Sequence, residues 1–300
     1  MDEQSEWVVE AVSDANVAAL IQYCAEHGSE HDDSYLPGAS FAVSAEQPSY
    51  LLLDHDEIAG AISLMRTDRF TQAGKARFSI FHSVSHTEVA YRRLFDAIQP
   101  HIAGLQEVYL FIPEQRRRVR HILEGLGFAV SRYSFVLVNR DLHRQHPEFP
   151  ANFAVRGLTS DDDAGLADFA RQLNINFAEL AGHADISAEE IRCWFDDDEY
   201  LDGGLSVLET DGRVIGTAWV TREYGDEDRA ELSALGVAPP YRGSGFGRGL
   251  LRWASRFALD HGFQSLVLSV NAENEQALQL YRTEGYELIE TVVCYTFSCS

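Results

Sequence analysis

The pattern of apolar and polar positions predicts strands and helices in alternation along the chain. Strands show alternating or continuous apolar positions, and helices show apolar positions three and four residues apart. In the first half these patterns predict a hairpin at 50–66, strands at 75–84, 107–112 and 128–139, and helices at 88–102 and 116–126. Strands alternating with helices predict an α/β fold, with a mixed β-sheet flanked by helices.

The second half repeats this order of elements. Gly60, in the first hairpin, corresponds to Gly216 in a second hairpin, and a helix-ending glycine recurs at a similar spacing. Such self-similarity indicates two copies of one domain. We therefore expect two tandem domains, at residues 1–145 and 150–300, joined by a polar connector that contains prolines.

Residues 231–251 carry the clearest chemical signal. An apolar strand stops at two consecutive prolines, and a helical pattern begins soon afterwards. Between them, glycine takes every second position: Gly243, Gly245, Gly247 and Gly249. A helix start presents unpaired N–H groups and partial positive charge, and glycine lets a phosphate approach the backbone closely. The stretch therefore predicts a phosphate site.

Two common phosphate motifs do not fit this loop. A dinucleotide fingerprint needs glycine at its first, third and sixth places, but the sixth place is Arg248 counted from Gly243 and Leu250 counted from Gly245. The Gly-Lys-Ser/Thr run of a P-loop does not occur here. A nicotinamide-dependent oxidoreductase is therefore disfavoured.

Arg242-x-x-Gly245-x-Gly247, after a strand that ends Leu-x-Val-x-Pro, resembles the acyl-CoA diphosphate loop of the GNAT superfamily of N-acyltransferases. A second motif follows in the order and spacing of that family. Asn274-x-x-Ala277-x-x-x-Tyr281, before a glycine and an aromatic residue, is similar to its second signature. The whole chain is similar to GNAT proteins built of two tandem domains.

The resemblance implies transfer of an acetyl or other acyl group from acetyl-CoA, the co-substrate, to a primary amine within a ternary complex. It also implies which residues bind the donor. These are Leu235, Gly236, Val237, Arg242, Gly243, Ser244, Gly245, Phe246, Gly247, Arg248, Asn274 and Tyr281. A non-catalytic module that senses acyl-CoA is the alternative.

Tyr281 matches the tyrosine that assists the leaving thiolate in the family; core packing is its alternative role. A carboxylate could take the proton of the attacking amine. Glu231 is the predicted base, because on a regular strand it shares a side with Leu235. An exposed glutamate at a strand end is the alternative, and Glu223 and Asp226 are substitutes.

The two predicted domains differ at the glycine loop. After the strand that ends at Val84, the chain enters its helix through Ser85-His86-Thr87, without Arg-x-x-Gly-x-Gly. Side chains would meet a diphosphate there. We therefore expect residues 1–145 to be a degenerate, non-catalytic GNAT-like domain and residues 150–300 to be the catalytic one.

The net charge is −23, from 47 acidic and 24 basic side chains. This excess disfavours nucleic acid and anionic membranes as partners. It is compatible with a cationic acceptor, either a small-molecule amine or a peptide amine, although a solvated acidic surface explains it equally. The sequence does not predict an oligomeric state.

The expected location is the cytoplasm. The first six residues are acidic, unlike a secretory leader, no apolar run reaches membrane-spanning length, and the four cysteines form no C-x-x-C pair. No metal site is expected. The run His27-Gly28-Ser29-Glu30-His31 matches an H-x-x-E-H zinc pattern, but its Gly-Ser pair predicts a helix end instead of the required helix.

Overall fold

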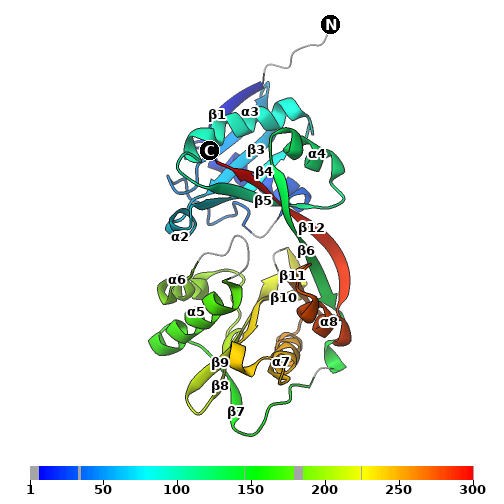
Figure 1. Cartoon of the computed structure of the whole chain (residues 1–300). Helices are drawn as coiled ribbons and strands as arrows, with labels where there is room; N and C mark the ends of the chain where they lie inside the picture. Colours follow the sequence, from blue (N-terminus) through cyan, green and yellow to red (C-terminus); the bar gives the residue numbers. More distant parts are fainter. Residues whose placement is uncertain (1–6, 33–34, 145, 179–184, 224, 300) are drawn as a thin grey trace. The chain divides into compact units, whose positions relative to one another are not determined.

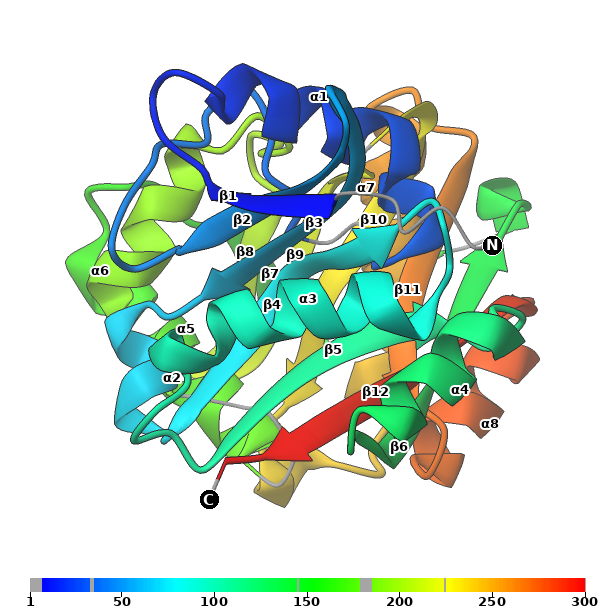
Figure 2. The same ribbon diagram turned by 90° about the horizontal axis from the view of Figure 1, so that it is seen from above.

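The computed structural model describes residues 7–32, 35–144, 146–178, 185–223 and 225–299. The acidic first six residues, used above to predict location, lie outside these ranges. The chain divides into two compact units. The first unit holds residues 1–134 and 291–300, and the second unit holds residues 135–290. Each unit has a β-sheet with helices on its faces (Figures 1 and 2).

This division differs from the expected boundary near residue 145, because the end of the chain belongs to the first unit. Strand β12 (Glu287–Ser298) runs into the first unit, where it pairs antiparallel with β5 (Glu107–Pro113). Strand β6 (Ala129–Asn139) runs out of that unit into the second. A sequence repeat shows which elements recur, but it does not show which sheet receives the last strand.

In the first unit the sheet has the strand order β1-β2-β3-β4-β5-β12. Helix α1 covers one face, and α3 and α4 cover the other, where α3 runs along the strands in Figure 2. The remaining elements are β1 (Trp7–Ala11), α1 (Val17–His27), the 3-10 helix η1 (Gly28–Glu30), β2 (Ser49–Asp54), β3 (Glu57–Met65), α2 (Asp68–Gln72), β4 (Lys75–Ser83), α3 (Glu88–Ile98), η2 (Gln99–His101) and α4 (Arg117–Gly125).

The H-x-x-E-H run lies at a helix end, as predicted. Helix α1 stops at His27, and a single 3-10 turn follows it. His27 and His31 are therefore not on one face of a continuous helix, which that zinc pattern requires.

In the second unit the strand order is β6-β11-β10-β9-β8-β7, to which β6 contributes residues 135–139. Helices α5 and α6 pack on one face and α7 on the other (Figure 1). The elements are η3 (Leu142–Arg144), β7 (Phe153–Gly157), α5 (Asp163–Phe177), α6 (Ala188–Cys193), η4 (Trp194–Asp196), β8 (Leu205–Thr210), β9 (Arg213–Glu223), β10 (Asp226–Val237), η5 (Pro239–Tyr241), α7 (Phe246–Asp260), β11 (Ser265–Asn271) and α8 (Glu275–Thr283).

In both sheets one pair of parallel strands separates after a short ladder, and the two pairs occupy equivalent positions in the repeat. In the second unit β10 and β11 are parallel neighbours only over Arg229–Glu231 and Ser265–Val267. In the first unit β4 and β5 pair only over Lys75–Arg77 and Glu107–Tyr109. Beyond these short ladders the parallel strands separate, so β10 and β4 each leave backbone groups without a strand partner on that side.

Both units also have a β-bulge at the corresponding position. On β10 the register with β9 shifts between Leu232 and Ala234, which makes Ser233 the extra residue. On β4 the register with β3 shifts in the same way around Ser79. A bulge adds one residue to one strand and so reverses the side on which later side chains lie. The repeat seen in the sequence is therefore also a structural repeat.

None of the helices in the described ranges combines the length and apolar character needed to cross a membrane. All four cysteines are free thiols.

Candidate functional site

A cleft of about 580 Å³ opens in the second unit where β10 and β11 separate. Its walls come from the end of α5, from β10 and β11, from the glycine loop and from α8. The lining residues are Asn176, Phe177, Leu232, Ser233, Ala234, Leu235, Gly236, Val237, Arg242, Gly243, Gly245, Gly247, Arg248, Leu268, Ser269, Val270, Asn271, Asn274, Gln276, Ala277, Gln279, Leu280, Tyr281 and Thr283. Most residues predicted to bind the donor are thus brought together.

The glycine loop delivers the N-terminus of α7 to this cleft. Gly243 and Gly245 have φ of 76° and 90°, a left-handed conformation that glycine adopts without strain. No heavy atom lies within 4 Å of a Cβ placed on either glycine. Gly245 is the N-cap of α7, and no side chain caps this helix. The first N–H groups of α7 are therefore available to an anion, which the helix dipole attracts.

Arg242 holds the glycine loop to the sheet. Its Nε donates to the carbonyl oxygen of Val237 (3.0 Å), and its Nη2 donates to Oδ1 of Asn176 (2.9 Å). These bonds connect the loop to β10 and to the end of α5. Arg242 therefore positions the glycine loop in this structure. Direct contact between Arg242 and a phosphate remains a prediction.

Two further arginines share one buried carboxylate. Nε of Arg248 lies 2.8 Å from Oε1 of Glu284, and Nε of Arg252 lies 2.7 Å from its Oε2. The Glu284 side chain is only 5% exposed, whereas that of Arg248 is 49% exposed. The pairing fixes both guanidinium groups on α7, beside the loop that reaches the cleft.

The second predicted motif forms the opposite wall. Oδ1 of Asn274 accepts the N–H of Ala277 at 3.1 Å and so caps α8. Asn274, Ala277 and Tyr281 all line the cleft, so they share the helix face that their spacing predicts. Tyr281 is 8% exposed, and burial raises the pKa of its phenol to about 12. The phenol is therefore a hydrogen-bond donor at neutral pH.

Glu231 does not lie on the side of β10 that was expected. The bulge at Ser233 interrupts the alternation, and Leu232 and Leu235, three residues apart, pack together in the core beneath α7. Glu231 is therefore on the opposite side from Leu235 and is not among the lining residues of the cleft. The premise of a regular strand was wrong, because a bulge depends on strand pairing that the sequence pattern does not show.

The substitute bases take part in a surface ion-pair cluster. Arg229 places its Nε 3.0 Å from Oε2 of Glu223 and its Nη2 2.9 Å from Oδ2 of Asp226. Neither carboxylate lines the cleft, and the described lining contains no Asp or Glu at all. The described lining itself therefore offers a bound amine no carboxylate.

The sequence reasoning missed several polar lining residues. Ser233 sits at the bulge, and its hydroxyl lies 2.9 Å from that of Thr221. Ser269 and Asn271 come from the edge of β11 that faces the opening, and Asn176 comes from the end of α5. None belongs to a recognisable motif, because the separation of two strands brings them together.

Comparison with known proteins agrees with this geometry. Residues 169–286 match the Acetyltransferase (GNAT) family. That span contains the glycine loop, α7, α8 and Tyr281. The family match therefore covers the elements that build most of the cleft.

Similar curated proteins match only part of their own length. A mycothiol acetyltransferase of Amycolatopsis mediterranei is 33% identical over 117 residues, which are 37% of this chain and 37% of that protein. A mycothiol acetyltransferase of Streptomyces coelicolor is 28% identical over 188 residues, 59% of this chain and 57% of that protein. The chain therefore spans about half the length of these relatives, or less.

A solved structure matches the whole chain. A tandem GNAT protein from the clavulanic acid biosynthesis pathway aligns over 98% of both chains, with a TM-score of 0.69 and 15% identity. At this identity the likeness shows the fold. The predicted fold, two tandem GNAT-like α/β domains, is confirmed.

Proposed function

We propose that this protein transfers an acetyl group from acetyl-CoA to a primary amine. The match of residues 169–286 to the Acetyltransferase (GNAT) family supports this proposal. The observation that carries the proposal is the uncapped N-terminus of α7, which opens beside the separated edge of β10. A CoA thioester carries a diphosphate and an amide-containing arm. The first suits a helix N-terminus, and the second suits a free strand edge.

The N–H groups at the start of α7, together with Gly243 and Gly245, would hold the diphosphate. The space beside both glycines supports this fit, since a side chain there would occupy the approach to the backbone. The arm would run along Leu235–Val237, whose backbone has no strand partner toward β11 in the described structure. The thioester would then reach the part of the cleft lined by Ser233 and Tyr281.

In the proposed reaction the neutral amine nitrogen attacks the thioester carbonyl carbon. A carbon–nitrogen bond forms, the carbon–sulfur bond breaks, and the electron pair leaves with sulfur as a thiolate. Tyr281 would donate a hydrogen bond to that sulfur. No covalent enzyme intermediate is needed, because holding both substrates in one cleft supplies much of the rate.

The pKa of Tyr281 limits its role. A thiol has a pKa of about 8.5, and burial raises the pKa of the Tyr281 phenol to about 12. Full proton transfer from phenol to thiolate would therefore be uphill by about 5 kcal/mol. Tyr281 is better suited to stabilise the developing thiolate by hydrogen bonding. The proton lost by the amine then neutralises the CoA thiolate.

Among the described residues, no carboxylate lines the cleft to take the amine proton directly, so the group that removes this proton is a proposal. Glu231 is kept as the proposed base, and it would have to act through water, because the described lining contains no carboxylate. The acceptor is proposed to be a small-molecule or peptide amine. The organisation resembles mycothiol synthase, and relatives are named mycothiol acetyltransferases, but no acceptor motif of this chain identifies that substrate.

We assign the chemistry to the second unit and propose that the first unit is not catalytic. In the first unit, Oγ1 of Thr87 accepts the N–H of Ala90, so a side chain caps α3 where α7 is uncapped. The register adds a second difference. Gly60 pairs with Ser83 as Gly216 pairs with Val237, so His82 occupies the position of Gly236. Its side chain would obstruct a pantetheine arm.

Calorimetry with acetyl-CoA, followed by product analysis on a panel of amines, tests the proposal. We expect saturable binding at one site and acetylation of at least one amine. The absence of binding by folded protein would exclude the assignment. Binding without turnover on a broad panel would instead support a module that senses acyl-CoA.

A further inference from the structure

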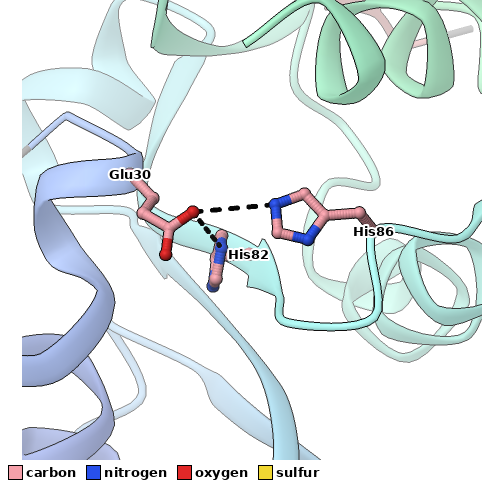
Figure 3. Close-up of side chains that lie close together, drawn as sticks. All are labelled: Glu30, His82 and His86. Atoms are coloured by element: carbon pink, nitrogen blue, oxygen red, sulfur yellow. Dashed lines mark ion pairs between the residues drawn. The ribbon is translucent and has the colours of Figure 1, made fainter.

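A cluster of imidazole and carboxylate groups lies in the first unit, beyond the point where β4 leaves β5. His82 is near the end of β4, His86 lies in the turn before α3, and Glu30 ends the 3-10 turn after α1 (Figure 3). Two segments that are distant in sequence, one with Glu30 and one with both histidines, thus converge on one point. This is the place that corresponds to the donor cleft of the second unit.

One carboxylate oxygen faces both rings. Oε2 of Glu30 lies 3.8 Å from Nε2 of His82 and 3.6 Å from Nε2 of His86 (Figure 3). The ligand atoms of the three residues all lie within 4.8 Å of one another. Two ligands at about 2.1 Å from one zinc ion can be at most about 4.2 Å apart. Both distances from Glu30 fall within this limit. The two Nε2 atoms, which are at most 4.8 Å apart, need only a small shift toward each other to meet it.

The other nitrogen of each ring is already occupied. Nδ1 of His86 lies 2.9 Å from the carbonyl oxygen of Val84, which can only accept, so this nitrogen carries hydrogen. Nδ1 of His82 lies 2.8 Å from Oη of Tyr23. Metal-binding histidines are oriented in this way, with one nitrogen bonded to an oxygen and the other presented to the ion. Both Nε2 atoms therefore face Glu30 in the arrangement that ligands require.

His82 supplies an independent observation. Its side chain is 2% exposed, and its Nε2 is buried without a hydrogen-bond partner. Buried polar atoms are rarely left without a partner, because desolvation costs about 1–3 kcal/mol. A cation bound by Nε2 of His82 removes this penalty.

We propose that Glu30, His82 and His86 bind one divalent transition-metal ion, with zinc as the best match. Two imidazole nitrogens and one carboxylate oxygen form a donor set that zinc uses in proteins, and softer thiolate ligands are not part of it. The ion would fasten the turn after α1 to β4 and to the turn before α3. Its role is structural and separate from acetyl transfer.

The neighbouring charges are consistent with such a site. Nη1 of Arg116 lies 2.8 Å from Oε2 of Glu30 and so orients the carboxylate. A carboxylate oxygen has two lone pairs, so one remains for an ion. Nδ1 of His27 lies 3.7 Å from Oε1, the other oxygen of Glu30. The Arg116 guanidinium also repels a cation at this oxygen, which lowers the affinity for the first ion as well as for a second, so we expect at most one ion.

The sequence pattern concealed this site. The H-x-x-E-H run contributes Glu30, whose Oε2 the structure brings to His82 and His86, two histidines that lie outside the run. The expectation of no metal rested on that run alone. The proposal replaces it with ligands from two separate segments, Glu30 from one and both histidines from the other.

Metal-free, tag-free protein titrated with Co²⁺ and then with Zn²⁺ tests the proposal. Co²⁺ bound by imidazole and carboxylate gives visible absorption bands, which Zn²⁺ abolishes by displacement. The main variant is His86→Asn. Residue 86 has φ of 48°, and asparagine tolerates this conformation better than alanine does. Glu30→Gln is the second variant, and His121→Ala, at a histidine whose side chain is 90% exposed, is the matched control.

We expect one equivalent of Co²⁺ in the parent and in His121→Ala. Each ligand variant should lose at least about tenfold in affinity, since even losing a partner behind a ligand costs about 10–100-fold. Absence of cobalt bands in folded parent protein would overturn the proposal. So would unchanged affinity in His86→Asn, because acidic surfaces bind divalent ions nonspecifically. Circular dichroism verifies that each variant is folded.

Discussion

At the scale of single residues, burial determines what Tyr281 can do. The side chain is 8% exposed and lines the cleft, and its phenol stays protonated at neutral pH. Its neighbour Tyr286 is buried to a similar degree, with the ring centroids 5.7 Å apart, but does not line the cleft. Tyr281 is therefore the one proposed to act in catalysis, and Tyr286 the one proposed only to pack.

Replacing Tyr281 by phenylalanine should lower kcat by about 10²–10⁴-fold. Acetyl-CoA affinity should change little, because the ring remains and only the hydroxyl is lost. Steady-state kinetics and calorimetry measure the two effects. Tyr286→Phe is the control and should retain kcat. Equal loss in both variants would assign Tyr281 to packing.

The pH profile offers a second test of the same residue. Burial raises the pKa of Tyr281 to about 12 from an ordinary value of 10.0. The active, protonated form is therefore present below that pKa and is lost only as pH rises through it. We expect kcat/KM to rise with deprotonation of the acceptor amine and not to fall by about pH 10. A decline centred near the ordinary tyrosine pKa would contradict a buried donor.

At the scale of elements, the helix that starts at the glycine loop is the one proposed to bind the donor. The sequence predicted the loop and the two motif helices because glycine spacing and helical periodicity are local properties. It did not predict the bulge at Ser233, which moved Glu231 away from Leu235, because a bulge depends on pairing with β9. It also did not reveal the cluster of Glu30, His82 and His86, whose members meet only in the folded unit.

Gly247→Ala separates helix stability from binding. Gly247 lies in α7 and lines the cleft, and an added Cβ would make only ordinary contacts, at 3.9 Å, with Leu280 and Val237. The variant should gain up to about 0.5–1 kcal/mol in folding stability, since alanine is favoured over glycine in a helix. Its acetyl-CoA affinity should fall about tenfold or more, because overpacking costs about 1–3 kcal/mol.

Gly125→Ala is the matched control for this experiment. Gly125 is also helical, at the end of α4 in the first unit, and an added Cβ would approach only Glu88, at 3.9 Å. It should leave donor affinity unchanged. Thermal unfolding and calorimetry on both variants give the comparison. Undiminished affinity in Gly247→Ala would mean that the donor does not approach this helix start.

At the scale of the whole molecule, the least predictable feature was the path of two strands: β12 joins the sheet of the first unit, and β6 runs from the first unit into the second. Repetition along the sequence indicated two similar domains, and the structure contains them. Their boundary could not be obtained in this way, because β12 completes the sheet of the first unit. Val293 and Tyr295 of this strand are fully buried there, among residues of α3 and α4.

Tyr295→Ala should therefore destabilise the first unit, although position 295 is close to the end of the sequence. Its Oη accepts from Nε of Arg120 and donates to Oε1 of Glu124, both at 3.0 Å. Loss of a large buried aromatic side chain costs about 3–5 kcal/mol. Hydrogen exchange should show faster exchange in β5 but not in β10. Leu288→Ala, at an exposed position of β12, is the control, and equal protection in both variants would contradict the assignment.

The same strand has a consequence for synthesis on the ribosome. The β12 partner of β5 is translated after the second unit, so the nascent first unit lacks this strand while residues 135–290 are being made. Nascent domains usually fold in order from the N-terminus. Here the first unit to emerge can complete its sheet only after residues 135–290 have been translated, and until then the edge of β5 that β12 covers is open to pairing with other chains.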